Sequence, residues 1–177
     1  KLLVQWMNRK QNNLKIWEVD PSNGMKTLFL NEEQKTWINL DDEGERIHFL
    51  ENGKGFIYLS DQTGFNHLYY YDMNGKLINA ISSGNFSVTD LDFVDEKNGI
   101  VYFSARKENT ARKDLYRINL NGKKMQRLTF GDYNHFSTVI SPAGSYFVTY
   151  YNNVSNPTRI ALLSNSGKLI KELADAK

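Results

Sequence analysis

Short apolar segments alternate with turn residues along the whole chain, and this pattern predicts β-strands. Segments such as "LYYYDM" and "KLINAI", or "LYRINL" and "KKMQRL", flank an Asn-Gly pair. Asn and Gly tolerate the positive φ that a tight hairpin turn requires, so each such stretch is typical of a β-hairpin. Helical periodicity is nearly absent. It is conceivable only in the last segment, "SGKLIKELADAK", whose first half we interpret as a strand.

The hairpin signal repeats at a regular interval. Turn glycines recur about every 45–50 residues, and a second series of glycines, placed before apolar strands, recurs in step with them. The first series is Gly24, Gly75, Gly122 and Gly167, and the second is Gly55, Gly99 and Gly144. A period of this length with four strands per unit is the signature of propeller blades. We therefore predict an all-β chain, a β-propeller segment of about four consecutive antiparallel blades.

The blade boundaries follow from the strands between the turns. The first blade lacks its first strand, because "LLVQWMN" already corresponds to the second strand of the other blades. We expect blade units at about residues 1–30, 31–82, 83–129 and 130–173. A strand edge near residues 1–9 should then be unpaired, and exposed edges favour pairing with another chain. A helix at residues 99–106 would contradict the propeller.

Composition and charge narrow the function classes. The 177 residues suit one domain, and 22 basic against 20 acidic residues give a net charge of +2. This balance argues against a nucleic-acid surface, which needs a clustered basic excess. The lack of cysteine excludes disulfides and thiolate chemistry. No apolar run approaches the ~20 residues of a membrane helix. No signal peptide is visible, and since the chain opens inside a predicted strand, we expect it to be part of a longer protein.

Candidate catalytic and metal-binding residues lack the patterns that these functions need. His48, His67 and His135 fall in different blades without a His-x-x-x-His motif or an acidic cluster, so we interpret them as structural residues. Ser104, His135 and Asp114 can be combined into a triad on paper, but no Gly-x-Ser-x-Gly elbow is present. We assign no catalytic residue, no metal ligand and no cofactor.

Three charged segments are interpreted as solvent-exposed. Glu32-Glu33 lies in "LNEEQKTW", a connection after an outer strand, and is predicted to be a solvated loop charge pair. "LDDEGE" at residues 40–45 lacks the alternating ligands of a calcium loop and is predicted to be a tight turn. "ARKENTARK" at residues 105–113 is predicted to be a basic surface loop, with a weak partner contact as the alternative.

Several stretches resemble one known family. "YLSDQTGFNHLYYYDMNGKL", "DLYRINLNGKKMQRLT" and "HFSTVISPAGSYFVTYYNNVSNPTRIALL" are similar to consecutive segments of the dipeptidyl peptidase IV propeller, in the prolyl oligopeptidase family. The most distinctive segment runs from Ser60 to Tyr69, Ser-x-x-x-Gly-x-x-His-Leu-Tyr. Phe86 departs from the family's Gly-x-Trp-x-Val element, where Trp is usual. The resemblance covers nearly the whole chain, from "VQWMNRKQNNLKIWEVD" through "TRIALL".

The resemblance implies a function for the parent protein. Such enzymes join an eight-bladed propeller to a C-terminal α/β-hydrolase domain and remove N-terminal dipeptides with Pro or Ala at the second position. The resemblance places the serine, its Asp and His, and the glutamate pair that holds the substrate amine outside this chain. The flanks of Glu32-Glu33 do not match that pair. We expect a propeller portion that gates substrate access and shapes the peptide cavity, and that is inactive alone.

The resemblance also sets expectations for substrate contacts, partners and location. Family residues near the place of Trp37 approach the substrate cavity, but the local match is poor, so the substrate-binding residues stay unknown. The expected partners are the hydrolase domain of the same parent chain and peptide substrates, without nucleic acid. A homodimer and edge-to-edge self-association of the fragment stay open. Members act in the periplasm or at the cell surface, and the lack of disulfides favours a bacterial periplasmic enzyme.

Two other functions stay open. One is a non-enzymatic propeller that binds proteins or glycans, such as a periplasmic scaffold, and the other is a small lectin. Propeller architecture alone does not separate them from a peptidase, because one fold serves many functions. A Gly-x-Ser-x-Gly elbow downstream of the chain would favour the peptidase.

Overall fold

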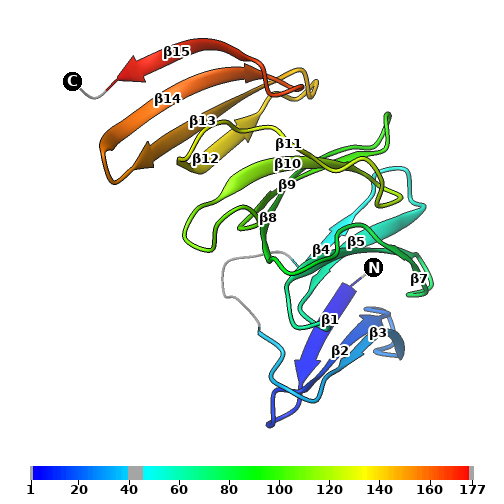
Figure 1. The fold of residues 1–177 in the computed structure, drawn as a ribbon. Coiled ribbons are helices and arrows are strands. Elements are labelled where there is room, and N and C mark those ends of the chain that lie inside the picture. Colours follow the sequence, from blue (N-terminus) through cyan, green and yellow to red (C-terminus); the bar gives the residue numbers. More distant parts are fainter. Residues whose placement is uncertain (1, 40–45, 176–177) are drawn as a thin grey trace. The chain divides into compact units, whose positions relative to one another are not determined.

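The computed structural model describes residues 2–39 and 46–175, and every regular element in these ranges is a β-strand (Figure 1). No helix in the described ranges is long and apolar enough to cross a membrane. The strands are β1 (Leu2–Met7), β2 (Asn13–Val19), β3 (Lys26–Glu33), β4 (Ile47–Phe49), β5 (Gly55–Ser60), β6 (His67–Asp72), β7 (Leu77–Ala80), β8 (Val88–Asp95), β9 (Ile100–Ala105), β10 (Asp114–Asn119), β11 (Gln126–Arg127), β12 (Asn134–Ile140), β13 (Tyr146–Asn153), β14 (Asn156–Ser164) and β15 (Leu169–Asp175).

The strands form four antiparallel sheets in which consecutive strands pair. Sheet A has the order β1-β2-β3, sheet B β4-β5-β6-β7, sheet C β11-β10-β9-β8 and sheet D β12-β13-β14-β15. Four-stranded meanders of this kind are propeller blades, so the predicted fold class is confirmed. Sheet A has three strands, as the missing first strand of its blade predicted. The strand β9 stands where a helix would have contradicted the propeller.

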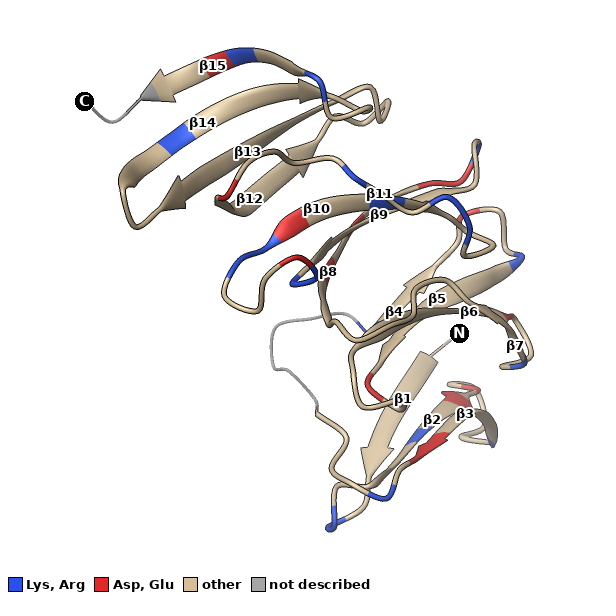
Figure 2. Ribbon diagram, viewed as in Figure 1, with Lys and Arg blue, Asp and Glu red and all other residues tan. Residues whose placement is uncertain are grey.

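The chain divides into two compact units, residues 1–78 and 79–177, here called the N-terminal and C-terminal units. Figure 2 shows acidic and basic residues mixed along the elements of each unit. This mixture agrees with the balanced charge of the sequence.

The N-terminal unit has an apolar core contributed by sheets A and B. In β2, Leu14 and Ile16 are both buried while Lys15 lies on the opposite face, because side chains alternate along a strand. The rings of Phe56 and Tyr71 stack with centroids 5.3 Å apart. The buried members of the cluster are Ile16, Phe29, Leu30, Phe56, Tyr58, Tyr69 and Tyr71.

The C-terminal unit has a second core, contributed by sheets C and D. In β13 the alternation buries Phe147, Thr149 and Tyr151, while Tyr146 and Tyr150 lie on the other face and are exposed. The buried members of this cluster are Tyr102, Leu115, Leu128, Phe147, Tyr151, Ala161 and Leu163. The repeated sequence segments thus place equivalent apolar residues in equivalent strands.

The hairpin turns use the predicted Asn-Gly pairs. Gly75, between β6 and β7, has a φ of 75°. A Cβ atom there would also overlap the carbonyl oxygen of Phe29, so the turn and its packing both require glycine. The second predicted series needs one refinement. Gly55 is not a turn residue but the first residue of β5, where a Cβ would overlap the Tyr71 carbonyl, and the turn before it uses Gly53 with a φ of 66°.

Candidate functional sites

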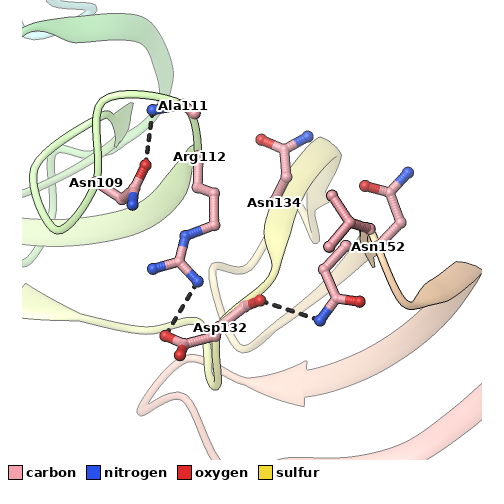
Figure 3. Close-up of a pocket in the computed structure, with 8 residues that line it drawn as sticks. Asn109, Ala111, Arg112, Asp132, Asn134 and Asn152 are labelled. Atoms are coloured by element: carbon pink, nitrogen blue, oxygen red, sulfur yellow. Dashed lines mark hydrogen bonds and ion pairs between the residues drawn. The ribbon is translucent and has the colours of Figure 1, made fainter.

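An open pocket of about 780 Å³ lies in the C-terminal unit, at the ends of the strands of sheets C and D (Figure 3). It is formed by the β9–β10 loop, the β11–β12 connection and the β13–β14 hairpin. We call it the asparagine pocket, and its polar lining residues are Asn109, Arg112, Asp132, Asn134, Asn152 and Asn153. The predicted basic loop therefore lies at the surface, as expected, and also forms one wall of this pocket.

The loops of the asparagine pocket are tied together by polar contacts. The guanidinium of Arg112 lies 3.0 Å from the carboxylate of Asp132. The side-chain amide of Asn153 donates to the backbone carbonyl of Asp132 at 3.2 Å. Within the β9–β10 loop, the Oδ1 atom of Asn109 accepts from the backbone N–H of Ala111 at 2.8 Å. In Figure 3 these contacts lie along the lower and left sides of the pocket.

Asn134 and Asn152 form another wall of the pocket. They are direct cross-strand partners in β12 and β13. The Oδ1 atom of Asn134 accepts from the backbone N–H of Lys113 at 2.9 Å. The Nδ2 atom of Asn152 donates to the hydroxyl of Thr158 at 3.2 Å. Each amide therefore has one end fixed by the protein, and the other end is left for a ligand or water.

A second polar site, here called the Glu32 cluster, is buried in the N-terminal unit. It consists of Glu32, Gln34, Arg46, Tyr58, Ser60 and Asp61. Glu32 was predicted to lie in a solvated loop, and this prediction is wrong, because its side chain is only 7% exposed. The reason is that β3 continues to Glu33, so that Glu32 falls on the same face as Leu30. Glu33 is exposed, as predicted.

The carboxylate of Glu32 is fully occupied by protein partners. It accepts hydrogen bonds from the Tyr58 hydroxyl, from Ser60 Oγ at 2.7 Å and from Gln34 Nε2 at 2.5 Å. The guanidinium of Arg46 lies 4.0 Å from it. Burial, followed by the charge of Glu32, raises the pKa of the Tyr58 hydroxyl, which therefore stays protonated and donates.

Asp61 extends the Glu32 cluster toward the end of β5. Its Oδ1 atom accepts from Gln34 Nε2 at 2.7 Å and lies 3.9 Å from the Arg46 guanidinium. Two carboxylates thus face one guanidinium, and the contacts join sheet A to sheet B. The carboxylates of the cluster are used within the protein, although Arg46 Nη1 is buried without a hydrogen-bond partner in the described residues. The network therefore fixes structure and offers a substrate little.

The structure does not form the candidate catalytic triad of Ser104, His135 and Asp114. The Asp114 carboxylate is occupied by Arg127, at 2.8 Å, and by the Thr129 hydroxyl, at 2.7 Å. The Nε2 atom of His135 lies 2.9 Å from the Phe130 carbonyl oxygen. Burial lowers the pKa of this imidazole, so it is neutral. Ser104 is not bonded to this base, because the Nδ1 atom of His135 has no hydrogen-bond partner in the described residues and its Nε2 atom faces Phe130.

The prediction that the three histidines fall in different blades is wrong for two of them, because His48 in β4 and His67 in β6 both belong to sheet B. His67 is buried and His48 is half-buried. Residues 2–39 and 46–175 contain no group of three or more His, Cys, Asp and Glu side chains suited to a metal ion. The "LDDEGE" segment at residues 40–45 lies outside the described residues.

Asp92 is a half-buried residue with one buried carboxyl oxygen, and the sequence did not indicate it. It lies in β8 at a break in the register with β9, between the pairs Leu91–Phe103 and Phe93–Tyr102. Its Oδ2 atom is buried without a hydrogen-bond partner in the described part of the chain. Burial raises the pKa of Asp92 to about 7, and the nearby charge of Asp90 adds to this shift. A β-bulge places an extra side chain at this point of the sheet.

Trp37 lies on the connection that follows β3. This connection is held to the β1–β2 hairpin, because Ile38 donates its backbone N–H to the Gln11 carbonyl at 2.8 Å. Ile38 is buried, whereas Trp37 is 73% exposed. The fold thus presents a large aromatic side chain to solvent on an anchored segment.

The sequence model described as "Dipeptidyl peptidase IV (DPP IV) N-terminal region" matches residues 1–158. The chain belongs to this family. The resemblance seen in the sequence is thereby confirmed over most of its length.

Individual relatives of this dipeptidyl peptidase IV N-terminal region agree with the assignment. Dipeptidyl peptidase 4 of Arthroderma otae is 27% identical over 139 residues, covering 71% of this chain and 18% of that protein. A probable dipeptidyl-aminopeptidase B of Aspergillus oryzae is 28% identical over 181 residues, covering 94% and 20%. The crystal structure of Porphyromonas gingivalis dipeptidyl peptidase 4 superposes with a TM-score of 0.84 at 29% identity, covering 98% of this chain and 24% of that one. The chain thus spans about a fifth of the curated relatives.

Proposed function

We propose that the chain is the propeller portion of a serine-type dipeptidyl peptidase that removes N-terminal dipeptides with Pro or Ala at the second position. The match of residues 1–158 to the dipeptidyl peptidase IV N-terminal region carries this proposal. The parent would complete an eight-bladed propeller and add a C-terminal hydrolase domain that holds the nucleophile. The blade units proposed within this chain are at about residues 1–30, 31–82, 83–129 and 130–173.

The role of this portion would be to gate access to the hydrolase site and to shape the peptide cavity. A non-catalytic role is supported by the contacts of the candidate triad residues. Asp114 is bound to Arg127 and Thr129, and His135 faces a backbone carbonyl. An acyl transfer needs a hydroxyl, a base and an acid in one hydrogen-bonded chain.

The parent is proposed to act in the periplasm or at the cell surface, as the family resemblance implies. Animal members of the family commonly carry disulfides in this part of the propeller, so the lack of cysteine favours a bacterial, periplasmic parent. Fractionation of cells that express the parent, followed by an immunoblot, tests this location. A parent found only in the cytoplasmic fraction would contradict it.

The free edge of sheet A supports self-association of the isolated chain. Among the described strands only β2 pairs with β1, and Leu2, Val4 and Trp6 of β1 are exposed. An apolar edge strand of this kind favours pairing with a second copy. Sedimentation of the isolated chain should therefore show a mass that rises with concentration, and a strict monomer at high concentration would contradict this proposal.

A non-enzymatic propeller that binds other molecules is the second candidate, because the asparagine pocket offers amide groups to a ligand. The gene that encodes the parent distinguishes the two candidates. The peptidase requires a Gly-x-Ser-x-Gly elbow downstream of residue 177, followed by an Asp and then a His. A parent that ends without this elbow would contradict the peptidase and favour the binding protein.

A further inference from the structure

The asparagine pocket presents a hydrogen-bond donor and an acceptor on adjacent strands. The backbone N–H of Lys113 can only donate, so the oxygen of Asn134 must face it and the amide N–H groups of Asn134 are left for the pocket. The Nδ2 atom of Asn152 is used by Thr158, which leaves the Asn152 oxygen as an acceptor. No other contact within the described ranges occupies these two groups.

The spacing of the two amides suits a single extended ligand. Asn134 and Asn152 are paired across β12 and β13, and paired side chains on one face of a sheet have Cβ atoms about 5 Å apart. In Figure 3 their amide ends lie on the same side of the pocket, away from the Arg112–Asp132 ion pair. A donor beside an acceptor at this spacing is the complement of a backbone C=O beside a backbone N–H.

We propose that the asparagine pocket binds the backbone of an extended peptide segment. The peptide carbonyl would accept from the Asn134 amide, and the peptide N–H would donate to the Asn152 oxygen. Main-chain hydrogen bonds of this kind give affinity that tolerates different side chains. Val154, fully exposed at the tip of the β13–β14 hairpin, adds an apolar contact for one side chain of the peptide.

The charge and composition of the pocket favour a neutral peptide over other ligands. Asp132 neutralises Arg112, so an anion gains little from the guanidinium. The described lining contains no aromatic ring on which a sugar could stack. Asparagine amides and one valine match the polar backbone and apolar side chains of a peptide.

This inference goes beyond the proposed function, because it assigns a ligand site to residues of this chain and needs no hydrolase domain. A parent that lacks the Gly-x-Ser-x-Gly elbow would end the peptidase proposal and leave this site intact. Failure of the binding experiment below would end the site and leave the peptidase proposal intact.

The experiment is a titration of the ¹⁵N-labelled chain, in which the side-chain amide signals of Asn134 and Asn152 are followed by NMR. The probes are acetyl-tetraalanine amide, a neutral blocked peptide, and maltotetraose, a neutral sugar of similar length. We expect the peptide to shift both signals in a saturable manner and the sugar to leave them unchanged. Saturable shifts by maltotetraose alone, or no shift by either probe in the millimolar range, would overturn the proposal.

Two variants with the same charge change sharpen the test. Asn134→Asp keeps an oxygen for the Lys113 N–H but replaces the donor of the pocket by an acceptor. Asn152→Asp keeps the acceptor, and the Thr158 hydroxyl can donate to its second oxygen. Asn134→Asp should weaken peptide binding about tenfold, because one hydrogen bond is replaced by a repulsive contact. Asn152→Asp should change it by less than about twofold.

Equal losses in the two variants would show a charge effect, and no loss in either would show that the amides do not contact the peptide. Both results overturn the assignment. The titration of the unmodified chain keeps the proposal testable if either variant fails to fold.

Discussion

The Glu32 cluster and the asparagine pocket are both rich in polar side chains, but they use them in opposite ways. In the Glu32 cluster, one buried carboxylate accepts hydrogen bonds from Tyr58, Ser60 and Gln34 and faces Arg46. Its acceptor sites are therefore occupied by the protein itself. In the asparagine pocket, Asn134 and Asn152 each have one amide end fixed and the other end open. The first arrangement joins two blades, and the second is suited to a ligand.

The difference has a physical origin in where the residues lie. Glu32 is inside a strand, so the alternation of side chains forces it toward the core, and a buried charge must be fully paired. The asparagines lie where strands end and loops begin, where solvent replaces any missing partner at little cost. A high content of polar side chains therefore does not by itself indicate a functional site. Donors and acceptors at a loop end that have no protein partner are the better indication.

The largest effect should come from breaking the Glu32 cluster. Glu32→Ala removes the acceptor of the buried Tyr58 and Ser60 hydroxyls and leaves Arg46 with the contact to Asp61 at 3.9 Å as its remaining ion pair. We expect a loss of about 3–5 kcal/mol in the free energy of unfolding, measured with urea, because two buried hydroxyls lose their acceptor and a buried guanidinium loses one of its two carboxylates. The neighbouring Glu33→Ala is the matched control, since Glu33 is exposed, and should cost less than about 0.5 kcal/mol. Equal costs would mean that the two glutamates are equally solvated.

Asp92 lies between the two cases, because the residue is half-buried and its buried Oδ2 atom has no hydrogen-bond partner in the described residues. Its pKa rises from 3.8 to about 7 on folding, so the proton stabilises the folded state. This stabilisation is complete below the unfolded pKa and is lost as the pH rises through the folded pKa. Between about pH 5 and about pH 8, we expect the chain to lose on the order of 2 kcal/mol relative to Asp92→Asn.

Urea unfolding at the two pH values measures this difference. Asp92→Asn has no carboxyl to ionise at this position, so it serves as the reference at both pH values. The same pH dependence in both proteins would contradict the burial of Asp92 as its cause.

The smallest effect on stability should come from the asparagine pocket. Asn134→Asp keeps the contact with the Lys113 N–H, and its second oxygen faces the open pocket. We expect the free energy of unfolding to change by less than about 0.5 kcal/mol, even though peptide binding weakens about tenfold. A loss as large as that of Glu32→Ala would show that the amide has a structural role and would remove the contrast between the two sites.

The fold could be predicted well from the sequence, because strands and turns depend on local patterns of apolar and turn-forming residues. The Asn-Gly pairs gave the hairpins, and their spacing gave the blades, down to the three-stranded first sheet. The exact end of β3 was harder to predict from the sequence. The strand extends to Glu33, and Glu32 is therefore buried and not solvated as predicted. Strand ends depend on tertiary pairing, here with β2 from Asn13 onward, which a local pattern does not contain.

The candidate sites were harder to predict than the fold. Asn134 and Asn152 come together only through the pairing of β12 and β13, and Arg112 joins them from the previous sheet. Asp92 reads as an ordinary strand residue, because the register break that buries it leaves no mark in the sequence. Absent motifs were more informative, since the missing elbow already argued against the Ser104, His135 and Asp114 triad.

The most direct test of the proposed function is hydrolysis of a Gly-Pro chromogenic amide by the isolated 177-residue chain and by its full-length parent. The chain should show no rate above background, because Ser104, His135 and Asp114 are not linked as an acyl-transfer triad. The parent should hydrolyse the amide readily and be blocked by a serine-directed inhibitor. An inhibitor-sensitive rate from the purified chain would contradict this account, and so would a well-folded parent without activity.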